Sequence, residues 1–393
     1  MRPRSAGQSD RQPPPRRLEV AFYNSSIVPK QYPVMGTLRL LLALSVAYGH
    51  LAVPLRFPTS DIAVQSFFVI SGFYMALVLN EKYGPGSYWL FISNRLLRLW
   101  PAYFVVLVLS LAAADNWSPM LALDWPSAAF FVGSQILIIG QDLYFFLCVN
   151  HDALAFTAHQ TETSAPLFKF VPIPQAWSLA IEINFYLVAP FLVRRGAMFI
   201  AALIAASLLL RMAMQGLLGL GGDPWSHRFF PSEIALFLSG ALGYRLSAST
   251  TKAERGRALV LLVVTAALVC ASLAINKWDG TQRVASVSPL AAMIVGVPWL
   301  FDLTKTFNID RYLGELSYPL YICHYLFGWL LLPNTYAGVH SALLLSLATS
   351  VVIYHLIDRP LDAWRQRRLD RSRRRTPIGR LIPSAQAISG GAG

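Results

Sequence analysis

"MGTLRLLLALSVAYGHL", residues 35–51, is an apolar segment with an arginine near its start and a histidine near its end. Arg39 and His50 are eleven residues apart, which in an α-helix is roughly three turns plus 20° and a rise of about 16 Å. The two side chains therefore share one face of the predicted helix. If the helix crosses a bilayer, the arginine lies near one surface and the histidine lies toward the other. Ionisable residues inside membrane spans are costly, so both mark a candidate functional site.

The composition of the whole chain agrees with a membrane environment. Of its 393 residues, 55% are hydrophobic and 13% are charged, and the mean hydropathy is +0.48. These values are too apolar for an ordinary soluble domain. The three cysteines have neither the spacing of a metal site nor an even number, so we expect no metal and no disulfide framework. They are Cys148, Cys270 and Cys323.

The net charge of +13 comes mostly from the two ends of the chain. Residues 1–31 hold six basic and two acidic residues, and residues 359–393 hold nine arginines and two aspartates. Basic flanks of apolar segments are typical of the cytoplasmic side and of anionic lipid headgroups, so we expect no nucleic acid as a partner. We predict disordered cytoplasmic tails at 1–34 and 359–393 around a membrane domain at 35–358.

Eleven apolar runs are long enough, or nearly so, to cross about 30 Å of hydrocarbon. An odd number of crossings would place the two basic tails on opposite sides, against the rule that Lys and Arg stay in the cytoplasm. We expect the run 127–148 to re-enter, because a polar stretch with a single lysine follows it. The prediction is an all-α membrane protein with about ten transmembrane helices, both termini in the cytoplasm and an external region at 115–176. The runs are 35–53, 62–80, 97–114, 127–148, 177–193, 197–214, 229–247, 258–275, 287–304, 316–332 and 338–357.

This topology places two titratable groups at the same depth. His50 lies roughly 5 Å from the outer end of its helix, and Glu182, in "QAWSLAIEINFY", lies roughly 8 Å below the outer start of its own. Neutral imidazole is a suitable general base near pH 7. We therefore predict that His50 handles the proton in catalysis and that Glu182 holds its tautomer, by the logic of catalytic triads. The alternative is a buried histidine satisfied by a neighbour.

A cluster of arginines is expected at the cytoplasmic mouth. "SNRLLRLWPAYF" places Arg95 and Arg98 three residues apart on one helical face. Alone they would be read as membrane anchors, but Arg39 in the first helix adds a third guanidinium. Because forked guanidinium donors match phosphate oxygens, the three predict a polyanion site.

Two further motifs hold polar residues inside apolar runs. "FFVISGF", residues 67–73, contains Ser71 and Gly72, and small residues in membrane helices ordinarily serve packing. "GELSYPLYICHYLF", residues 314–327, places His324 near mid-membrane. That histidine could be a second proton-handling group or an interhelical hydrogen-bond partner, and both readings stay open. Asp358 before Arg359 indicates the end of the last span with a local ion pair.

Together these stretches resemble the acyltransferase-3 family of membrane acyltransferases, over about residues 34–362. The last helix departs from the family pattern by ending in Asp358 and Arg359 rather than in glutamate. A glutamate pair common in the family is also reduced here to Glu182 followed by Ile183. The matching features are Arg39 and His50 with ten residues between them, "FFVISGF" with Ser71, Arg95 and Arg98 before "PAY", "WSLAIEINFY" with Trp177, Ser178 and Tyr186, and "SYPLYICH" with Tyr318 and His324.

The resemblance implies an O-acyltransferase of the bacterial cytoplasmic membrane. It implies transfer of an acyl group, commonly acetyl among relatives, from cytoplasmic acyl-CoA to a hydroxyl of a carbohydrate or glycolipid at the outer face. Acyl-CoA is then a co-substrate held at Arg39, Arg95 and Arg98, with no permanently bound cofactor. Direct transfer with His50 as base and an acyl-histidine intermediate both stay open.

Two other functions compete with this one. Intramembrane charges would also serve a transporter or flippase of an anionic lipid-linked or polysaccharide intermediate, but we find no internal repeat of the kind that such proteins show. A scaffold without chemistry would leave His50 and Glu182 at matched depth unexplained.

For an acyltransferase, we expect the sugar to bind to the external region, where aromatic and short polar groups gather. These are Trp117, Trp125, Tyr144, His151, His159 and Glu162.

Overall fold

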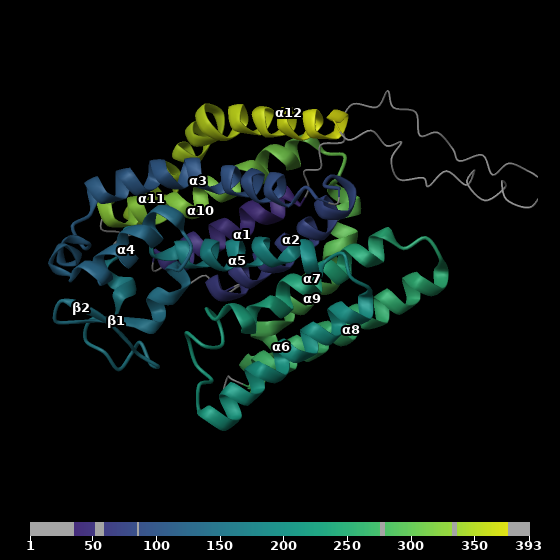
Figure 1. The fold of residues 1–393 in the computed structure, drawn as a ribbon, viewed down its shortest axis with the longest axis horizontal. Coiled ribbons are helices and arrows are strands. Elements are labelled where there is room, and N and C mark those ends of the chain that lie inside the picture. The colour runs from purple at the N-terminus through teal and green to yellow at the C-terminus, as the bar shows by residue number, and fades with distance from the viewer. Residues whose placement is uncertain (1–34, 52–58, 85, 276–279, 332–335, 376–393) are drawn as a thin grey trace, which may run out of the picture. The chain divides into compact units, whose positions relative to one another are not determined.

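The computed structural model describes residues 35–51, 59–84, 86–275, 280–331 and 336–375. Within these ranges, ten helices coincide with the expected apolar runs other than 127–148, and Figure 1 shows their arrangement. They are α1 (Gly36–His50), α2 (Ser60–Glu81), α3 (Tyr88–Ala113), α5 (Trp177–Leu192), α6 (Ala197–Leu218), α7 (Phe230–Ala248), α8 (Lys252–Ile275), α9 (Gly280–Thr304), α10 (Asn308–Leu331) and α11 (Tyr336–Ile353). The predicted tail at 1–34 lies outside the described residues.

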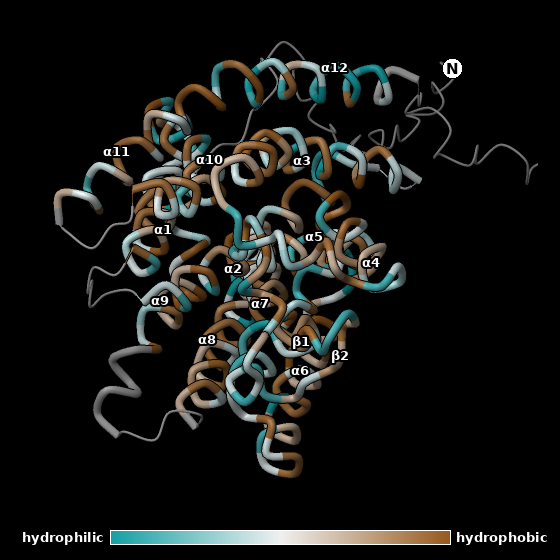
Figure 2. Tube along the Cα trace, turned by 90° about the vertical axis from the view of Figure 1, so that its left-hand side faces the viewer, coloured by the Kyte–Doolittle hydropathy of each residue, from teal (hydrophilic) through white to brown (hydrophobic). Residues whose placement is uncertain are grey.

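Six helices in the described part of the chain are long and apolar enough to cross a membrane. Hydrophobic residues follow most of the helical turns in Figure 2. The chain is therefore an integral membrane protein. The number of ten crossings and the sides on which the termini lie stay predictions. The six candidate spans are Ser60–Glu81, Tyr88–Ala113, Ala197–Leu218, Lys252–Ala274, Val287–Thr304 and Ala337–Ser372.

The run 127–148 forms no helix of spanning length. Helix α4 (Trp125–Leu137) has 13 residues, or about 20 Å at the usual rise per residue. It begins where the side chain of Asp124 accepts the Ser127 amide, an N-terminal cap. A 3₁₀ helix, η2 (Gln141–Phe146), follows, and then β1 (Leu147–Asn150) pairs antiparallel with β2 (Ala153–Phe156).

The segment from 114 to 176 is more ordered than the long loop that the sequence predicts. Three more 3₁₀ helices lie in it, and α4 and the hairpin lie together in both views (Figures 1 and 2). Buried hydrogen bonds tie it to α3: Tyr103 donates to Gln135 at 3.1 Å, and Gln141 donates to Tyr103 at 2.8 Å. The 3₁₀ helices are η1 (Ser118–Ala122), η3 (Leu167–Phe170) and η4 (Pro174–Ala176).

Helices α1 and α10 pack at very short distance. The carboxylate of Asp310 accepts the amides of Gly36 and Thr37, both at 2.8 Å, and Thr304 accepts the amide of Met35 at 2.9 Å. A Cβ on Gly36 would stand 1.6 Å from the Asp310 carbonyl oxygen, so only glycine fits. The first amides of a helix have no partner within it. Here residues at the end of α9 and in α10 supply all three.

Glycines also hold α2 against α7. A Cβ on Gly72 would lie 1.8 Å from the Phe237 carbonyl oxygen, and one on Gly240 would lie 1.9 Å from that of Val69. The packing role expected for the small residues of "FFVISGF" therefore applies to Gly72. Its neighbour Ser71 bonds a carboxylate, as described below.

A buried ion pair, absent from the sequence prediction, joins α6 to α7 and α2. Arg211 Nη2 lies 2.7 Å from Glu233 Oε1, and Gln65 donates to the same oxygen at 3.4 Å. Both charged side chains are buried, Glu233 completely. Buried charges are tolerated only when they are paired and hydrogen-bonded.

The arginine-rich C-terminal segment is not the disordered tail that the sequence predicts over its whole length. A π-helical turn (Tyr354–Asp358) leads from α11 into α12 (Arg359–Arg375). Both views show α12 lying along α3 (Figures 1 and 2). The prediction of disorder rested on the run of arginines, but Arg365 and Arg368 donate hydrogen bonds to residues of α3. Residues 376–393 lie outside the described part.

The glycine contact between α1 and α10 makes a first prediction. Gly36→Ala forces the two backbones apart, and overpacking of this kind costs about 1–3 kcal/mol or more. We expect a clear fall of the thermal midpoint of the detergent-solubilised protein. Gly216→Ala is the control, because nothing lies within 4 Å of a Cβ on that helical glycine. Equal midpoints for the two variants would contradict the contact.

The buried pair makes a second prediction. Arg211→Met leaves Glu233 as an unpaired buried charge, so we expect a loss of about 3–5 kcal/mol in unfolding free energy. The double variant Arg211→Met, Glu233→Met removes both charges and should recover most of that loss. Thermal unfolding of wild type, both single variants and the double variant measures the coupling. Additive losses would show that the two side chains act independently.

Candidate functional site

A pair of histidines joins α1 to α10 at one end of the helices. His50 Nδ1 lies 2.9 Å from His324 Nε2, and the two rings are nearly parallel, with centroids 5.2 Å apart. The ring of Tyr325 lies against both. His324 is completely buried, whereas His50 is exposed. We call this end of the protein, predicted to face outward, the histidine end.

The histidine pair suits general base chemistry. In the tautomer where His50 Nδ1 donates to His324 Nε2, the other nitrogen of His50 keeps a lone pair. When that nitrogen takes a proton, His324 still accepts from Nδ1 and so stabilises the imidazolium. This is the orienting role that the carboxylate has in catalytic triads. His324 therefore forms an interhelical hydrogen bond with His50, which was one of the two roles that the sequence left open for it.

Glu182 does not contact His50 among the described residues, so the predicted pairing of these two is wrong. Its carboxylate accepts from Ser71 at 2.7 Å and from Tyr186 at 2.6 Å. Depth along a helix follows from residue counting, but the direction in which a side chain points around the helix does not. Helix α5 turns Glu182 toward α2, while α1 turns His50 toward α10.

The start of α5 is nevertheless close to the histidine pair. Ser178 Oγ lies 2.7 Å from Tyr321 Oη, and the ring of Tyr321 lies 6.0 Å from that of His324. Gln175 donates to the carbonyl of Ile322 at 2.8 Å. The predicted candidate Ser178 thus supports the helix turn that carries His324.

Charged residues that the sequence prediction did not assign to the site gather beside the histidines. The guanidinium of Arg228 lies between the rings of Phe145 and Trp177, at 3.8 Å and 4.3 Å, and binds Asp223 at 3.0 Å. The adjacent His227 lies 3.4 Å from Asp61. Arg228 and Asp61 are near enough for their charges to act on the His50 imidazole. The sequence did contain a signal for Arg228, because this arginine lies on the predicted outer side of the membrane, where basic residues are rare.

The opposite end of the same helices holds the three predicted arginines and is called the arginine end. Arg98 binds Glu315 of α10 at 2.5 Å, and Arg39 lies near Gly314, the preceding residue. Arg95 stacks on Phe91, with 5.9 Å from its guanidinium carbon to the ring centroid. The cluster also contains carboxylates. One of them belongs to Glu315, a residue of the motif "GELSYPLY" to which the sequence prediction gave no role.

Further contacts join the arginine end to the interior. The Phe91 ring under Arg95 contacts the ring of Tyr186, which donates to Glu182. Tyr318 donates to the carbonyl of Leu99 on α3 at 2.6 Å. The predicted residues Ser71, Tyr186 and Tyr318 therefore lie between the arginines and the histidine pair, where they hold α2, α3, α5 and α10 together.

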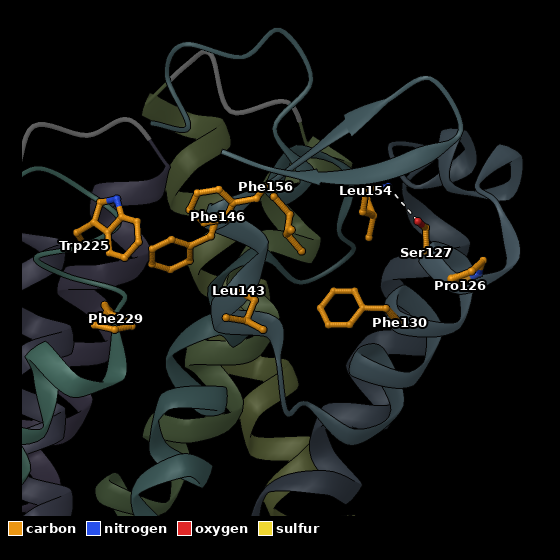
Figure 3. A pocket seen from close by; sticks show the side chains of 10 residues that line it. Pro126, Ser127, Phe130, Leu143, Phe146, Leu154, Phe156, Trp225 and Phe229 are labelled. Carbon is orange, nitrogen blue, oxygen red and sulfur yellow. Dashed lines mark hydrogen bonds between the residues drawn. The ribbon is translucent and has the colours of Figure 1, made fainter. Parts of the chain in front are cut away.

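An apolar groove lies in the segment 114–176 against the loop before α7 (Figure 3). Its volume is about 520 Å³. The hydroxyl of Ser127 already accepts from the amide of Leu154 at 2.9 Å, so the lining suits an apolar group better than a sugar. Tyr144, expected to meet the sugar, is buried, while Trp125 is 79% exposed. The lining residues are Pro126, Ser127, Phe130, Leu143, Phe146, Leu147, Leu154, Phe156, Trp225 and Phe229.

No cluster of three or more metal-binding side chains occurs among the residues that the structure describes.

The chain is similar to proteins of a known family. A family model described as "Acyltransferase domain" matches residues 35–356. A protein of Aquifex aeolicus (strain VF5), described as uncharacterized, is 28% identical over 205 residues, which make up 50% of this chain and 88% of that protein. No solved structure matches the chain.

A buried carboxyl in η2 links the 114–176 segment to α5. Asn184 donates to Asp142 Oδ2 at 3.3 Å. Burial raises the pKa of Asp142 to about 6, because the loss of solvation outweighs hydrogen bonds from backbone amides and from Asn184. An acid whose pKa is raised by folding favours the folded state when it is protonated. Its contribution is therefore greatest below about pH 4 and is lost as the pH rises to about 6.

Asp142→Asn should remove this pH dependence. Two pKa units correspond to about 3 kcal/mol. We expect the wild-type thermal midpoint to fall, relative to that of the variant, between pH 4 and pH 6, and the difference to stay constant above pH 6. Asp115→Asn, at an exposed position of the same segment, should follow the wild-type curve. A constant difference between Asp142→Asn and wild type over the whole range would contradict the prediction.

Proposed function

The chain belongs to the acyltransferase-3 family, and from that premise we propose that it moves an acyl group from cytoplasmic acyl-CoA to a hydroxyl of an acceptor at the outer face. Acetyl is the group that we propose, and the acceptor is a carbohydrate or glycolipid. The observation that carries the proposal is the pairing of α1 with α10, which places guanidinium groups at one end and two imidazoles at the other.

The arginine end suits the donor. Arg98 of α3 binds Glu315, Arg39 of α1 lies near Gly314, and Arg95 lies three residues before Arg98 on α3. Guanidinium donors match the oxygens of a diphosphate in pairs. With the phosphates bound there, the pantetheine arm reaches between the helices toward the histidines. The rise of about 16 Å from Arg39 to His50 is the distance that it has to cover along α1.

The histidine end suits the transfer. The acceptor oxygen attacks the thioester carbonyl carbon, its proton passes to His50, and the carbon–sulfur bond breaks to release the CoA thiolate, which takes up that proton. His324 holds the His50 ring and accepts from it throughout, which makes it a positioning residue. Base catalysis of this kind contributes typically 10²–10⁴-fold to the rate.

The apolar groove favours a glycolipid over a free sugar. It opens beside Trp225 and Phe229, which flank the pair His227 and Arg228 next to the histidine end. The lipid part of an acceptor placed in the groove would bring a sugar hydroxyl toward His50. Family membership gives the transporter alternative no comparable support.

The experiment uses purified protein in liposomes with radiolabelled acetyl-CoA and a glycolipid extract. We expect label in the carbohydrate fraction with wild type and a loss of about 10²–10⁴-fold with His50→Ala. His340→Ala is the control, since that histidine is exposed and contacts only Tyr48 among the rings of described residues. Equal labelling by wild type and His50→Ala would contradict the assigned base.

The role of His324 needs a separate measurement. His324→Ala should lower kcat and leave KM for acetyl-CoA unchanged, because that residue lies away from the arginine end. His324→Gln keeps an acceptor for His50 and should retain more of kcat. A rise of KM with unchanged kcat in both variants would contradict the positioning role.

A further inference from the structure

Helix α12 is fastened to the turn of α3 that carries the arginines. Arg365 donates to the carbonyl of Asn94 at 3.1 Å, and Arg368 donates to the side chains of Asn94 and Ser93, both at 3.1 Å. The next residue along α3 is Arg95. The C-terminal segment therefore lies at the edge of the proposed donor site.

The charges at this edge do not balance. Arg98 is shared between Glu315 and Asp362, at 2.5 Å and 3.7 Å, and Arg365 pairs with Asp362. Asp358 is buried and its charge acts on Arg98. Among the residues that the structure describes at this edge, five guanidinium groups lie near three carboxylates. They are Arg39, Arg95, Arg98, Arg365 and Arg368 against Glu315, Asp358 and Asp362.

Within the described ranges, three of these arginines also have N–H groups without a hydrogen-bond acceptor. Arg95 has no carboxylate partner among the described residues and lies against the Phe91 ring. Arg95 Nε, Arg98 Nη1 and Arg365 Nε are buried and donate to nothing in that part of the chain. A buried N–H of a charged group without an acceptor is costly. A phosphate group supplies several acceptors and the missing negative charge together.

We propose that α12 completes the donor site, with Arg365 joining Arg95 and Arg98 to bind a phosphate group of the acyl donor. Asp362 holds Arg365 and Arg98 when the site is empty and competes with the phosphate. The proposal rests on the proposed function, because acyl-CoA is the phosphate-bearing ligand in question.

A purely structural clamp would explain the hydrogen bonds to Asn94 and Ser93 but not the excess of charge. The two readings differ in the expected effect of Asp362. A competing carboxylate weakens phosphate binding, so that its removal should tighten it. A structural carboxylate has no such effect, and its removal only loosens α12.

The test measures binding of acetyl-CoA and of acetyl-pantetheine, which lacks phosphates, to the full chain in detergent, together with KM and kcat. Arg365→Gln should weaken acetyl-CoA binding about tenfold to a hundredfold, as expected for charge-assisted hydrogen bonds, and should raise KM with little change in kcat. Asp362→Asn should tighten acetyl-CoA binding. Neither variant should alter the binding of acetyl-pantetheine.

Arg367→Gln is the matched control, because this arginine of α12 is exposed and, among the described residues, donates only to the carbonyl of Ala363. Thermal midpoints show whether each variant folds. If acetyl-CoA binds wild type and Arg365→Gln equally, or if Asp362→Asn weakens binding, the proposal for α12 is overturned while the proposed function stands.

Binding of inorganic pyrophosphate distinguishes a failure of the anion site from a failure of the assignment of acyl-CoA as the donor. If wild type binds pyrophosphate in an Arg365-dependent way but does not bind acetyl-CoA, the anion site is supported and acyl-CoA is excluded as the donor. If it binds neither, both the site and the donor are overturned.

Discussion

The structure depends on the contact between the first helix and the tenth. A helix that begins at a membrane surface has amide groups without partners, and these must be satisfied before the helix is stable in a nonpolar medium. Asp310 and Thr304 satisfy them for α1, and the glycine at position 36 lets the two backbones approach. The contact fixes the register of α1 against α10. Every other pairing between these helices follows from that register.

One consequence is the separation of two chemistries along a single helix pair. The register that sets Gly36 on Asp310 also brings Arg39 near Gly314 and Glu315, and brings His50 onto His324. Positive charge gathers at one end, where it is partly neutralised by carboxylates. Imidazole, a base that can stay neutral, stands at the other. Away from this helix pair, Arg211 of α6 and Glu233 of α7 compensate each other's charge.

Residue patterns were sufficient to predict most of the helices and to single out candidate site residues, but not the partners of those residues. Apolar runs predict the helices well because each needs about 20 apolar residues to span hydrocarbon. The arginines of α3 and the histidine of α1 could be singled out because charge is expensive there. Glu182 was paired with the wrong partner, since depth does not fix direction around a helix. Asp310, Glu315 and α12 act through contacts more than 200 residues away in sequence, which no local pattern records.

The capping of α1 also bears on how the protein is made. The first helix leaves the ribosome more than 250 residues before Thr304, Asp310 and His324, which complete its end and its site. Until α10 enters the membrane, the amides at the start of α1 lack these acceptors and His50 lacks its partner. A chain that ends before α10 therefore lacks both the cap of α1 and the histidine pair. Assembly of the site is, in this sense, one of the last events of synthesis.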